Sequence, residues 1–202
     1  MDKIAIVILA AGESTRLGRP KQTLFYNGKS LVQHVADEAR MAGLAPVILV
    51  TGAFEKEVLD KLHPDGLSIL HNDRWKEGMA TGIRLGVEKL EAMGGADAVI
   101  ISVCDQPFVS AAILKSLHEK QLHSGKGIVA SAYAGTVGVP VLYTSNYFTG
   151  LKELEEGEGA KKLIHHFAGD VAHIDFDAGA IDIDTEEDYN LLLDKSSEGA
   201  LQ

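Results

Sequence analysis

The sequence predicts a three-layer α/β/α protein with a mostly parallel sheet. Short runs rich in Val and Ile alternate with longer stretches whose apolar residues recur at helical spacing. This alternation is typical of a parallel sheet with helices on both faces. The length of 202 residues suits a single domain, and the composition does not change along the chain. We therefore expect one domain over residues 1–194 and a tail over 195–202.

The first two thirds of the chain carry the clearest pattern. Buried strands are expected at residues 4–9, 46–51, 98–103 and 127–132, where Val and Ile are dense. Helices are expected at residues 30–42, 55–62, 77–93 and 110–123. The first three of these strands are each followed by a helix, so the strands are expected to run parallel.

The last third changes rhythm. Short strands are expected at residues 138–143, 171–176 and 180–183, around a helix at 159–167. This shift predicts an antiparallel excursion over the edge of the sheet, where a second ligand could lie. Thr185 is expected to cap a final helix that has three acidic residues in its first turn.

Charge and cysteine content restrict the class of protein. Nineteen basic and 29 acidic residues give a net charge of −10, which argues against binding to nucleic acids or anionic membranes. The single cysteine, Cys104, excludes an internal disulfide and favours a reducing compartment. No apolar stretch is long enough for a signal sequence or a membrane span. We expect a cytoplasmic protein.

Residues 9–22, LAAGESTRLGRPKQ, are the most informative segment, and we call them the signature loop. A glycine-bearing turn after a buried strand lets backbone N–H groups approach an anion. Arg16, Arg19 and Lys21 follow within a few residues and could neutralise phosphate oxygens. The loop predicts a site for a nucleoside triphosphate. The alternative is an ordinary strand-to-helix connection with solvated basic side chains.

Two acidic segments are expected at the same edge of the sheet as this loop. Asp105 follows the strand at 98–103, and Asp182 and Asp184 close the last predicted strand. Ligands of open parallel sheets bind at the carboxyl ends of the strands, and Mg²⁺ prefers carboxylate and phosphate oxygens. We predict Asp105 and Asp184 as ligands of Mg²⁺, with Asp182 left open as an alternative to Asp184. Helix capping is the competing interpretation for both residues.

The signature loop resembles that of the MobA-like nucleotidyltransferases, LAAG-x-S-x-R-[LM]-G-x-P-K. The resemblance extends to N-x-x-W-x-x-G-M at residues 72–79 and to a D-[MQ]-P motif at residues 105–107. Gln106 in the D-[MQ]-P motif favours the branch that contains the molybdenum cofactor (MocA-like) cytidylyltransferases. The resemblance implies a Rossmann-like fold similar to that of the nucleotide-diphospho-sugar transferases.

The resemblance also implies roles for individual residues. Catalytic roles fall to Arg16, Lys21 and Asp105. Binding of the acceptor is expected at Gly138, Pro140, Gly159 and Lys161. The expected nucleotide-binding residues are Leu9, Ala10, Ala11, Gly12, Ser14, Arg16, Lys21, Asn72, Gly78, Met79 and Asp105.

The activity implied is transfer of CMP from CTP to a phosphate-bearing acceptor of the molybdopterin type, with Mg²⁺ as cofactor and release of pyrophosphate. A nucleotidyltransferase that acts on a sugar phosphate or another small molecule is one alternative. A nucleotide-binding regulatory protein without catalysis is another. An NAD-linked enzyme is disfavoured because the loop lacks G-x-G-x-x-G. His165 and His166 are adjacent on a predicted helix and point apart, which disfavours a joint metal or acid–base role.

Overall fold

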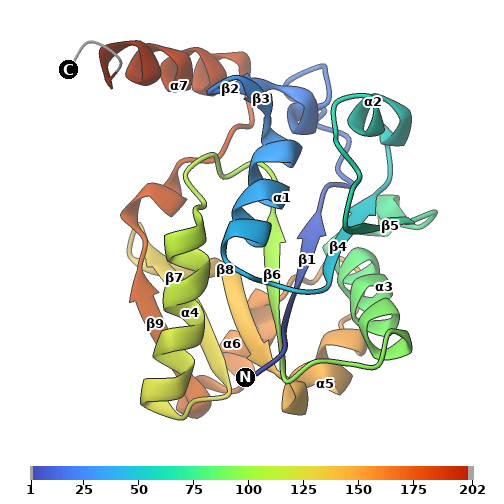
Figure 1. The fold of residues 1–202 in the computed structure, drawn as a ribbon, viewed down its shortest axis with the longest axis vertical. Coiled ribbons are helices and arrows are strands. Elements are labelled where there is room, and N and C mark those ends of the chain that lie inside the picture. The colour runs from blue at the N-terminus through green and yellow to red at the C-terminus, as the bar shows by residue number, and fades with distance from the viewer. Residues whose placement is uncertain (1, 200–202) are drawn as a thin grey trace.

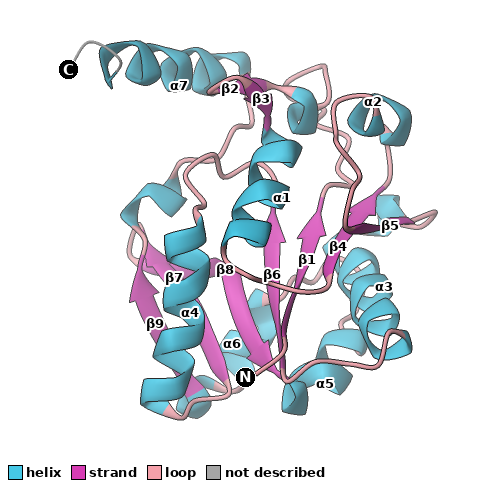
Figure 2. Ribbon diagram, in the orientation of Figure 1, coloured by secondary structure: helices cyan, strands magenta, loops and turns pink. Residues whose placement is uncertain are grey.

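The computed structural model describes residues 2–199, which form a seven-stranded sheet with helices on both faces (Figure 1 and Figure 2). The predicted three-layer fold is confirmed. The strands are β1 (Ile4–Leu9), β4 (Val47–Thr51), β5 (Leu67–His71), β6 (Ala98–Val103), β7 (Ile128–Tyr133), β8 (Thr136–Thr144) and β9 (Val171–Asp175), with a separate two-stranded ribbon of β2 (Phe25–Tyr26) and β3 (Lys29–Ser30).

The order of strands in the sheet is β5-β4-β1-β6-β8-β7-β9. The strands β5, β4, β1 and β6 are parallel, because each is reached through a helical or looped crossover. The strand β8 runs antiparallel to both β6 and β7, and β9 is parallel to β7. The expected antiparallel excursion is therefore present, and it begins beside β6, at the centre of the sheet.

Helices cover the sheet in two groups. The helices are α1 (Leu31–Met41), α2 (Glu55–Leu59), α3 (Met79–Ala92), α4 (Ala111–Ser124), α5 (Phe148–Lys152), α6 (Lys161–His166) and α7 (Glu186–Gly199). Helices α1 and α4 lie on the face toward the viewer in Figure 1, whereas α3, α5 and α6 lie on the opposite face.

The core is divided by the sheet, and β1 belongs to both halves. Ile6 and Ile8 pack with α1 and α4, whereas Val7 and Leu9 pack with α3, α5 and α6. Side chains of a strand alternate between the two faces, so a continuous apolar run is what a strand covered on both sides requires. A third, smaller cluster joins the β2–β3 ribbon to α7 and includes Ile183.

The prediction of a strand at residues 180–183 is wrong. Residues Asp177–Ala180 form a 3₁₀ turn, and the chain then continues without regular structure to α7. The backbone N–H of Ile183 donates to the carbonyl of Asp105 (3.1 Å), and the side chain of Ile183 is buried in the third cluster. These contacts tie the segment to the loop after β6 instead of to a neighbouring strand.

Other boundaries differ from the sequence prediction. The helix expected from residue 77 begins at Met79, because Gly78 has a φ of +100° that ends the preceding turn. The sequence analysis did not predict β2, β3, β5 or α5. The helix α7 extends through residues 195–199, which we expected to form a tail, and residues 200–202 lie outside the described residues.

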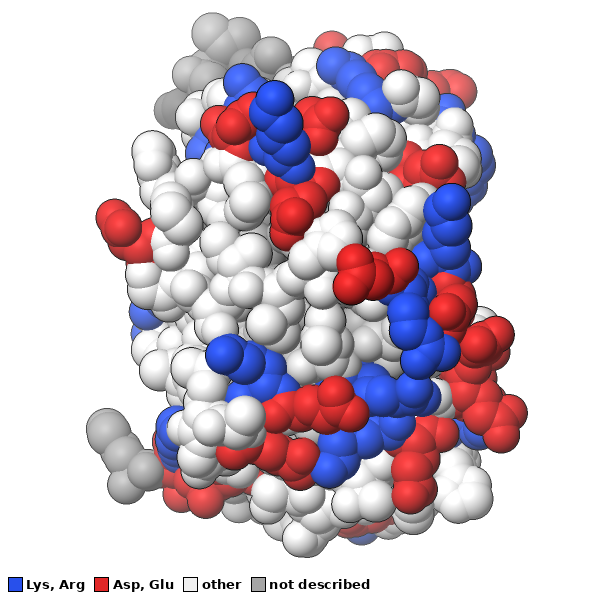
Figure 3. Space-filling model, turned by 90° about the vertical axis from the view of Figure 1, so that its right-hand side faces the viewer, with Lys and Arg blue, Asp and Glu red and all other residues white. Residues whose placement is uncertain are grey.

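Two surface properties bear on the class of protein. Within residues 2–199, no helix combines the length and apolar character that a membrane crossing requires. Figure 3 shows the face that carries α2 and α3, where basic side chains lie next to acidic ones instead of gathering in a single basic area.

Candidate functional site

The signature loop is anchored through its backbone to the end of β4. The N–H of Ala10 donates to the carbonyl of Val50 (2.9 Å), and the N–H of Ala53 donates to the carbonyl of Ala11 (3.1 Å). Gly52 makes this approach possible, because a Cβ atom there would lie 2.8 Å from the Cβ of Ala11. The first part of the loop is therefore fixed by the parallel sheet.

Gln22 holds the same loop from beneath. Its amide Nε2 donates to the carbonyls of Ala10 (3.1 Å) and Gly12 (2.8 Å), and only 1% of the residue is exposed. Two accepting carbonyls fix the amide nitrogen on this side. The sequence analysis did not single out Gln22. Its position beside Lys21 was the only available signal, since a polar residue in a loop is ordinarily exposed.

Ser14 shapes the turn that leads to Lys21. Its backbone has a φ of +53°, its carbonyl accepts hydrogen bonds from the N–H groups of Leu17 and Gly18, and its Oγ accepts one from the N–H of Lys21 (3.1 Å). Ser14 thus orients Lys21 through the backbone. In contrast, Gly12 is exposed, and a Cβ atom there would meet nothing, so space remains above the loop.

Lys21 lies between two carboxylates that are distant in sequence. Its Nζ is 2.5 Å from Oδ2 of Asp105 and 3.0 Å from Oδ1 of Asp184. Burial alone would lower the pKa of Lys21, but the charges and hydrogen bonds of the two carboxylates outweigh burial and raise it above its ordinary value. Lys21 is therefore a fixed cation, with 17% of its side chain exposed.

The two carboxylates are positioned by different means. Asp105 follows β6, and its carbonyl accepts from the N–H of Ile183. Asp184 precedes α7, whose first turn is capped reciprocally by Thr185 and Asp188. The N–H of Asp188 donates to Oγ1 of Thr185, and the N–H of Thr185 donates to Oδ2 of Asp188 (2.8 Å). Thr185 thus caps the last helix as predicted. Asp184 also forms an ion pair with Arg16, whose side chain is 69% exposed.

The Asp105–Asp184 pair has features that suit a divalent cation. Oδ1 of Asp105 is buried and has no hydrogen-bonding partner, although a buried carboxylate oxygen without a partner is costly. The other oxygen of Asp105 and one oxygen of Asp184 already converge on the ammonium of Lys21. Among the described residues, no three His, Cys, Asp or Glu side chains gather into a metal site. A metal held here would therefore need further oxygens from a bound phosphate.

A cavity of about 260 Å³ opens beside Lys21 and Asp105, and we call it the loop cavity. It includes most of the predicted nucleotide-binding residues, whereas Ser14 and Arg16 do not line it. Its lining residues are Leu9, Ala10, Ala11, Gly12, Lys21, Gln22, Asn72, Trp75, Gly78, Met79, Gly82, Val103, Cys104 and Asp105. The structure thus brings together segments that follow β1, β5 and β6.

Asn72 lines the loop cavity, but its amide is already engaged. Oδ1 accepts from the N–H of Arg74 (3.1 Å), which forms an Asx turn, and Nδ2 donates to Oγ1 of Thr81 (2.9 Å). Gly78 follows the 3₁₀ turn at Trp75–Glu77 and lies next to the backbone of Gly157. The N–H of Gly157 donates to the carbonyl of Glu77 (3.2 Å). The segment at residues 72–82 therefore forms one wall of the cavity and contacts the loop before α6.

A second cavity, of about 270 Å³, adjoins the first through Leu9 and Met79, and we call it the hairpin cavity. Gly138, Gly159 and Lys161, three of the residues predicted to bind the acceptor, line it. Pro140 lines none of the cavities described here. It is buried in β8, where its carbonyl accepts from Oγ of Ser131 (2.7 Å). Its predicted contact with the acceptor therefore has no support in the geometry.

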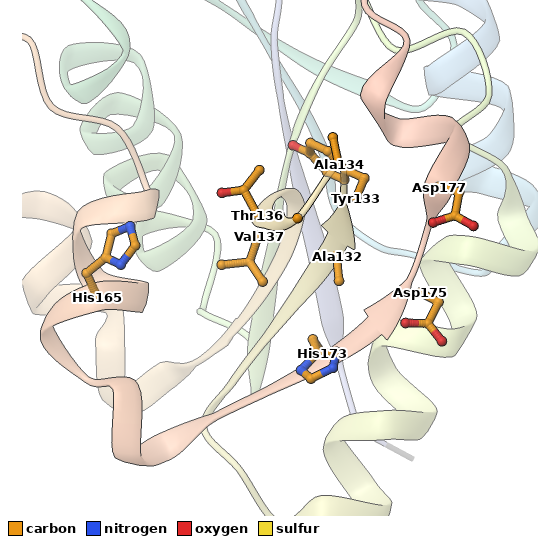
Figure 4. Close-up of a pocket in the computed structure, with 10 residues that line it drawn as sticks. Ala132, Tyr133, Ala134, Thr136, Val137, His165, His173, Asp175 and Asp177 are labelled. Carbon is orange, nitrogen blue, oxygen red and sulfur yellow. The ribbon is translucent and has the colours of Figure 1, made fainter.

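Two further cavities surround the turn between β7 and β8. The acid cavity, about 310 Å³, includes Asp105, Gln106 and Asp182. The outer cavity, about 500 Å³, lies beyond the turn, with His165 on one wall and His173, Asp175 and Asp177 on the other (Figure 4). The histidine and aspartate side chains of the outer cavity come from separate elements, α6 and the β9 segment, and do not converge in this view.

Cys104 is a packing residue. It is 3% exposed, belongs to the core cluster under α1 and α4, and burial raises the pKa of its thiol. A neutral buried thiol is a poor nucleophile.

Comparison with known proteins identifies the family. The sequence model of the MobA-like NTP transferase domain matches residues 6–172. The purine catabolism protein PucB of Bacillus subtilis (strain 168) is 27% identical over 197 residues, which cover 92% of this chain and 94% of PucB. The nicotine blue oxidoreductase of Paenarthrobacter nicotinovorans is 32% identical over 105 residues, about half of each chain.

Solved structures give the same result. The crystal structure of Rv0371c from Mycobacterium tuberculosis H37Rv is 30% identical, with a TM-score of 0.82 over 96% of this chain and 98% of Rv0371c. A second structure of Rv0371c, in complex with manganese, is 28% identical with a TM-score of 0.78 over 95% of this chain and 98% of that one. The family model covers most of the sequence, including the signature loop and Asp105, and the protein therefore belongs to the family of MobA-like NTP transferase domains.

Proposed function

We propose that this protein transfers CMP from CTP to a phosphate monoester of the molybdopterin type, with Mg²⁺ as cofactor. The observation that carries the proposal is the convergence of Asp105 and Asp184 on Lys21, with Lys21 and Asp105 lining the loop cavity. A fixed cation and two carboxylates beside the glycine-bearing signature loop form an environment suited to a metal-bound triphosphate.

The reaction is an in-line displacement at the α-phosphorus. An oxygen of the acceptor phosphate forms a bond to this phosphorus, and the bond from the α-phosphorus to the bridging oxygen breaks as pyrophosphate leaves. The acceptor is already anionic at neutral pH, so no protein base has to remove a proton. Positioning and charge neutralisation are therefore the main contributions of the protein.

The side chains have separate tasks in this proposal. Lys21 neutralises the phosphates, and Ser14 and Gln22 hold the backbone that presents Lys21. Arg16 adds charge at the rim. Asp105 and Asp184 would hold Mg²⁺, and the unpartnered Oδ1 of Asp105 supports this role. Mg²⁺, when bound, supplies Lewis-acid stabilisation of the charge that develops on the α-phosphate and on pyrophosphate.

The choice of CTP depends on resemblance more than on geometry. Gln106 belongs to the motif that favours cytidylyltransferases, but its side chain lines the acid cavity and its Nε2 donates to the carbonyl of Gly179 (2.8 Å). Gln106 therefore supports the loop after β6 and does not face the loop cavity. Backbone groups of residues 9–12 and 78–79 remain the candidates for contact with the base.

A pyrophosphate-release assay tests the proposal. CTP, GTP, ATP and UTP are each combined with molybdopterin and with a panel of sugar phosphates, with Mg²⁺ present or chelated. We expect release with CTP and molybdopterin only, and loss of release in excess chelator. The variant Asp105→Asn serves as the inactive reference.

The other outcomes identify the alternatives. Release with a sugar phosphate would indicate a different acceptor class. Binding of CTP in calorimetry without release under any condition would indicate a regulatory protein. Because one relative is named an oxidoreductase, the same preparation is also tested for oxidation of NADH and NADPH. Turnover of a nicotinamide cofactor without pyrophosphate release would contradict the proposal.

A further inference from the structure

Tyr133 lies where the cavities beyond Asp105 meet. It is the last residue of β7 and lines the hairpin, acid and outer cavities. Figure 4 shows it at the β7–β8 turn, next to Thr136 and between the walls formed by His165 and Asp177. A ligand that extends from the loop cavity toward the turn would therefore reach this side chain. None of the motifs in the sequence includes it.

The ring of Tyr133 is held in a defined position. It packs edge-on against Phe176, with the ring centroids 6.4 Å apart. Two glycines make room for it: a Cβ atom at Gly179 would lie 2.8 Å from Cδ1 of Tyr133, and a Cβ atom at Gly138 would overlap the hydroxyl oxygen. The absence of a side chain at Gly138 thus has a specific consequence: it leaves room for the Tyr133 hydroxyl beside a residue that lines the hairpin cavity.

The hydroxyl is a hydrogen-bond donor at neutral pH. Burial raises the pKa of Tyr133. A hydrogen bond with the Gln106 side chain lowers this pKa, whereas the negative charges of Asp182 and Asp105 raise it further. A protonated phenol can donate one hydrogen bond to a phosphate oxygen.

Two more donors border the same cavity. Nζ of Lys161 lies 2.5 Å from Oγ1 of Thr136, and both side chains are exposed. Since the ammonium donates in this contact, the hydroxyl hydrogen of Thr136 is left for another acceptor. Among the described residues, Lys161 forms no ion pair, so its charge is available to a ligand.

We propose that Tyr133, Thr136 and Lys161 form a phosphate site that binds the terminal phosphate of the acceptor and directs it toward the loop cavity. This inference rests on the proposed function and deepens it, because it names the residues that select a phosphate monoester. Tyr133 has the central position, since it lines both the hairpin cavity and the outer cavity, where the remainder of a large acceptor would lie. One cation and two neutral donors are sufficient to bind a phosphate group.

Inorganic phosphate is the probe for this site, measured by ³¹P NMR titration. The protein is first saturated with the α,β-methylene analogue of CTP and Mg²⁺, which occupies the loop cavity and prevents transfer. We expect Tyr133→Phe and Thr136→Val each to weaken phosphate binding about tenfold, the usual cost of one hydrogen bond to a charged group. Affinity for the analogue should change by less than about twofold, because neither residue lines the loop cavity.

Matched controls separate binding from structure. Tyr147→Phe removes a hydroxyl that donates a hydrogen bond to Asp170 outside these cavities. Lys162→Met removes the ammonium group next to Lys161 in sequence; Lys162 forms an ion pair with Glu158. Both should bind phosphate like the wild type, whereas Lys161→Met should bind it more weakly still. Thermal unfolding of Tyr133→Phe should match the wild type, because the ring contact with Phe176 remains.

Two results would overturn the inference: unchanged phosphate affinity in Tyr133→Phe, or no phosphate binding by the wild type. If the analogue does not bind but phosphate binding depends on Tyr133, the proposed function fails and the phosphate site stands. In that case the titration is carried out without the analogue.

Discussion

The loop cavity and the hairpin cavity adjoin each other but satisfy their charges differently. Lys21, which lines the loop cavity, is paired with Asp105 and Asp184, and Arg16, outside the cavity lining, is paired with Asp184, so two cations face two anions. In the hairpin cavity, Lys161 contacts only a hydroxyl, that of Thr136, among the interactions of the described residues. One site is internally neutralised, and the other presents a free positive charge.

This difference predicts different binding behaviour. A ligand of the hairpin cavity can bind without breaking an ion pair. A triphosphate in the loop cavity must draw Lys21 away from two carboxylates, which then need another cation. Triphosphate and divalent cation should therefore each increase the affinity for the other, and this coupling is reciprocal. The variants below either remove this coupling or show that it does not exist.

Asp105→Asn should have the largest effect. It removes a charge that lies beside Lys21, on a carboxylate that has one buried oxygen without a hydrogen-bonding partner. We expect kcat/KM for the triphosphate to fall about a thousandfold, as when a group that stabilises transition-state charge is lost. Pyrophosphate release measures the effect. Asp97→Asn is the matched control, because Asp97 lies at the opposite end of β6, where it accepts from the N–H of Lys3. Near-normal turnover in Asp105→Asn would exclude Asp105 from the metal site.

Lys21→Gln should lower triphosphate turnover and raise the affinity for a divalent cation. Triphosphate turnover should fall about a hundredfold, because a fixed cation next to the phosphates is lost. Binding of Mn²⁺ without nucleotide, followed by electron paramagnetic resonance, should become about tenfold tighter, since the two carboxylates lose their internal cation. Lys29→Gln, which removes a surface pair with Asp37, is the control. Weaker Mn²⁺ binding in Lys21→Gln would show that Lys21 does not compete with the metal.

Asp184→Asn and Asp182→Asn compare the two candidates at the second carboxylate. Asp184 contacts Lys21 (3.0 Å), whereas Asp182 faces the acid cavity. Burial there raises the pKa of Asp182, and the negative charges of Asp184 and Asp105 raise it further. We expect turnover to fall about thirtyfold for Asp184→Asn and less than about threefold for Asp182→Asn. Coupling between Mn²⁺ and triphosphate, measured by calorimetry, should be reduced only in the first variant. The reverse order of effects would assign the second carboxylate to Asp182.

The fold was predictable from sequence where burial was continuous. The strands β1, β4, β6 and β7 are apolar runs covered on both faces, and their predicted ends agree with the structure to within a residue or two. Edge strand β5 is half-buried and contains Ser68 and His71, so it lacks such a run. Residues 180–183 show the opposite error: alternation of Ile and Asp indicates a strand, yet Ile183 is buried because it closes a cluster under α7.

The candidate site was predictable to a similar extent. A dense motif and the rule for strand ends suffice to bring Lys21 and Asp105 together, because both depend on the parallel part of the sheet. Gln22 and Tyr133 could not be found in this way. Gln22 acts through two backbone carbonyls, and Tyr133 gains its position from Gly138 and Gly179, a relation that exists only in three dimensions.

Arg16→Gln should have the smallest effect of the charge changes around Lys21, Asp105 and Asp184. Arg16 is 69% exposed and lies at the rim, so water and salt screen its charge. We expect triphosphate affinity, measured by calorimetry, to fall about threefold at low salt and to approach the wild-type value at high salt. Arg19→Gln is the control, because Arg19 forms a bidentate pair with Glu186 away from the cavity. A salt-independent loss as large as that of Lys21→Gln would mean that Arg16 leaves Asp184 and closes over the phosphates. The pairing of charges in the loop cavity would then be a resting arrangement that the triphosphate replaces as a whole.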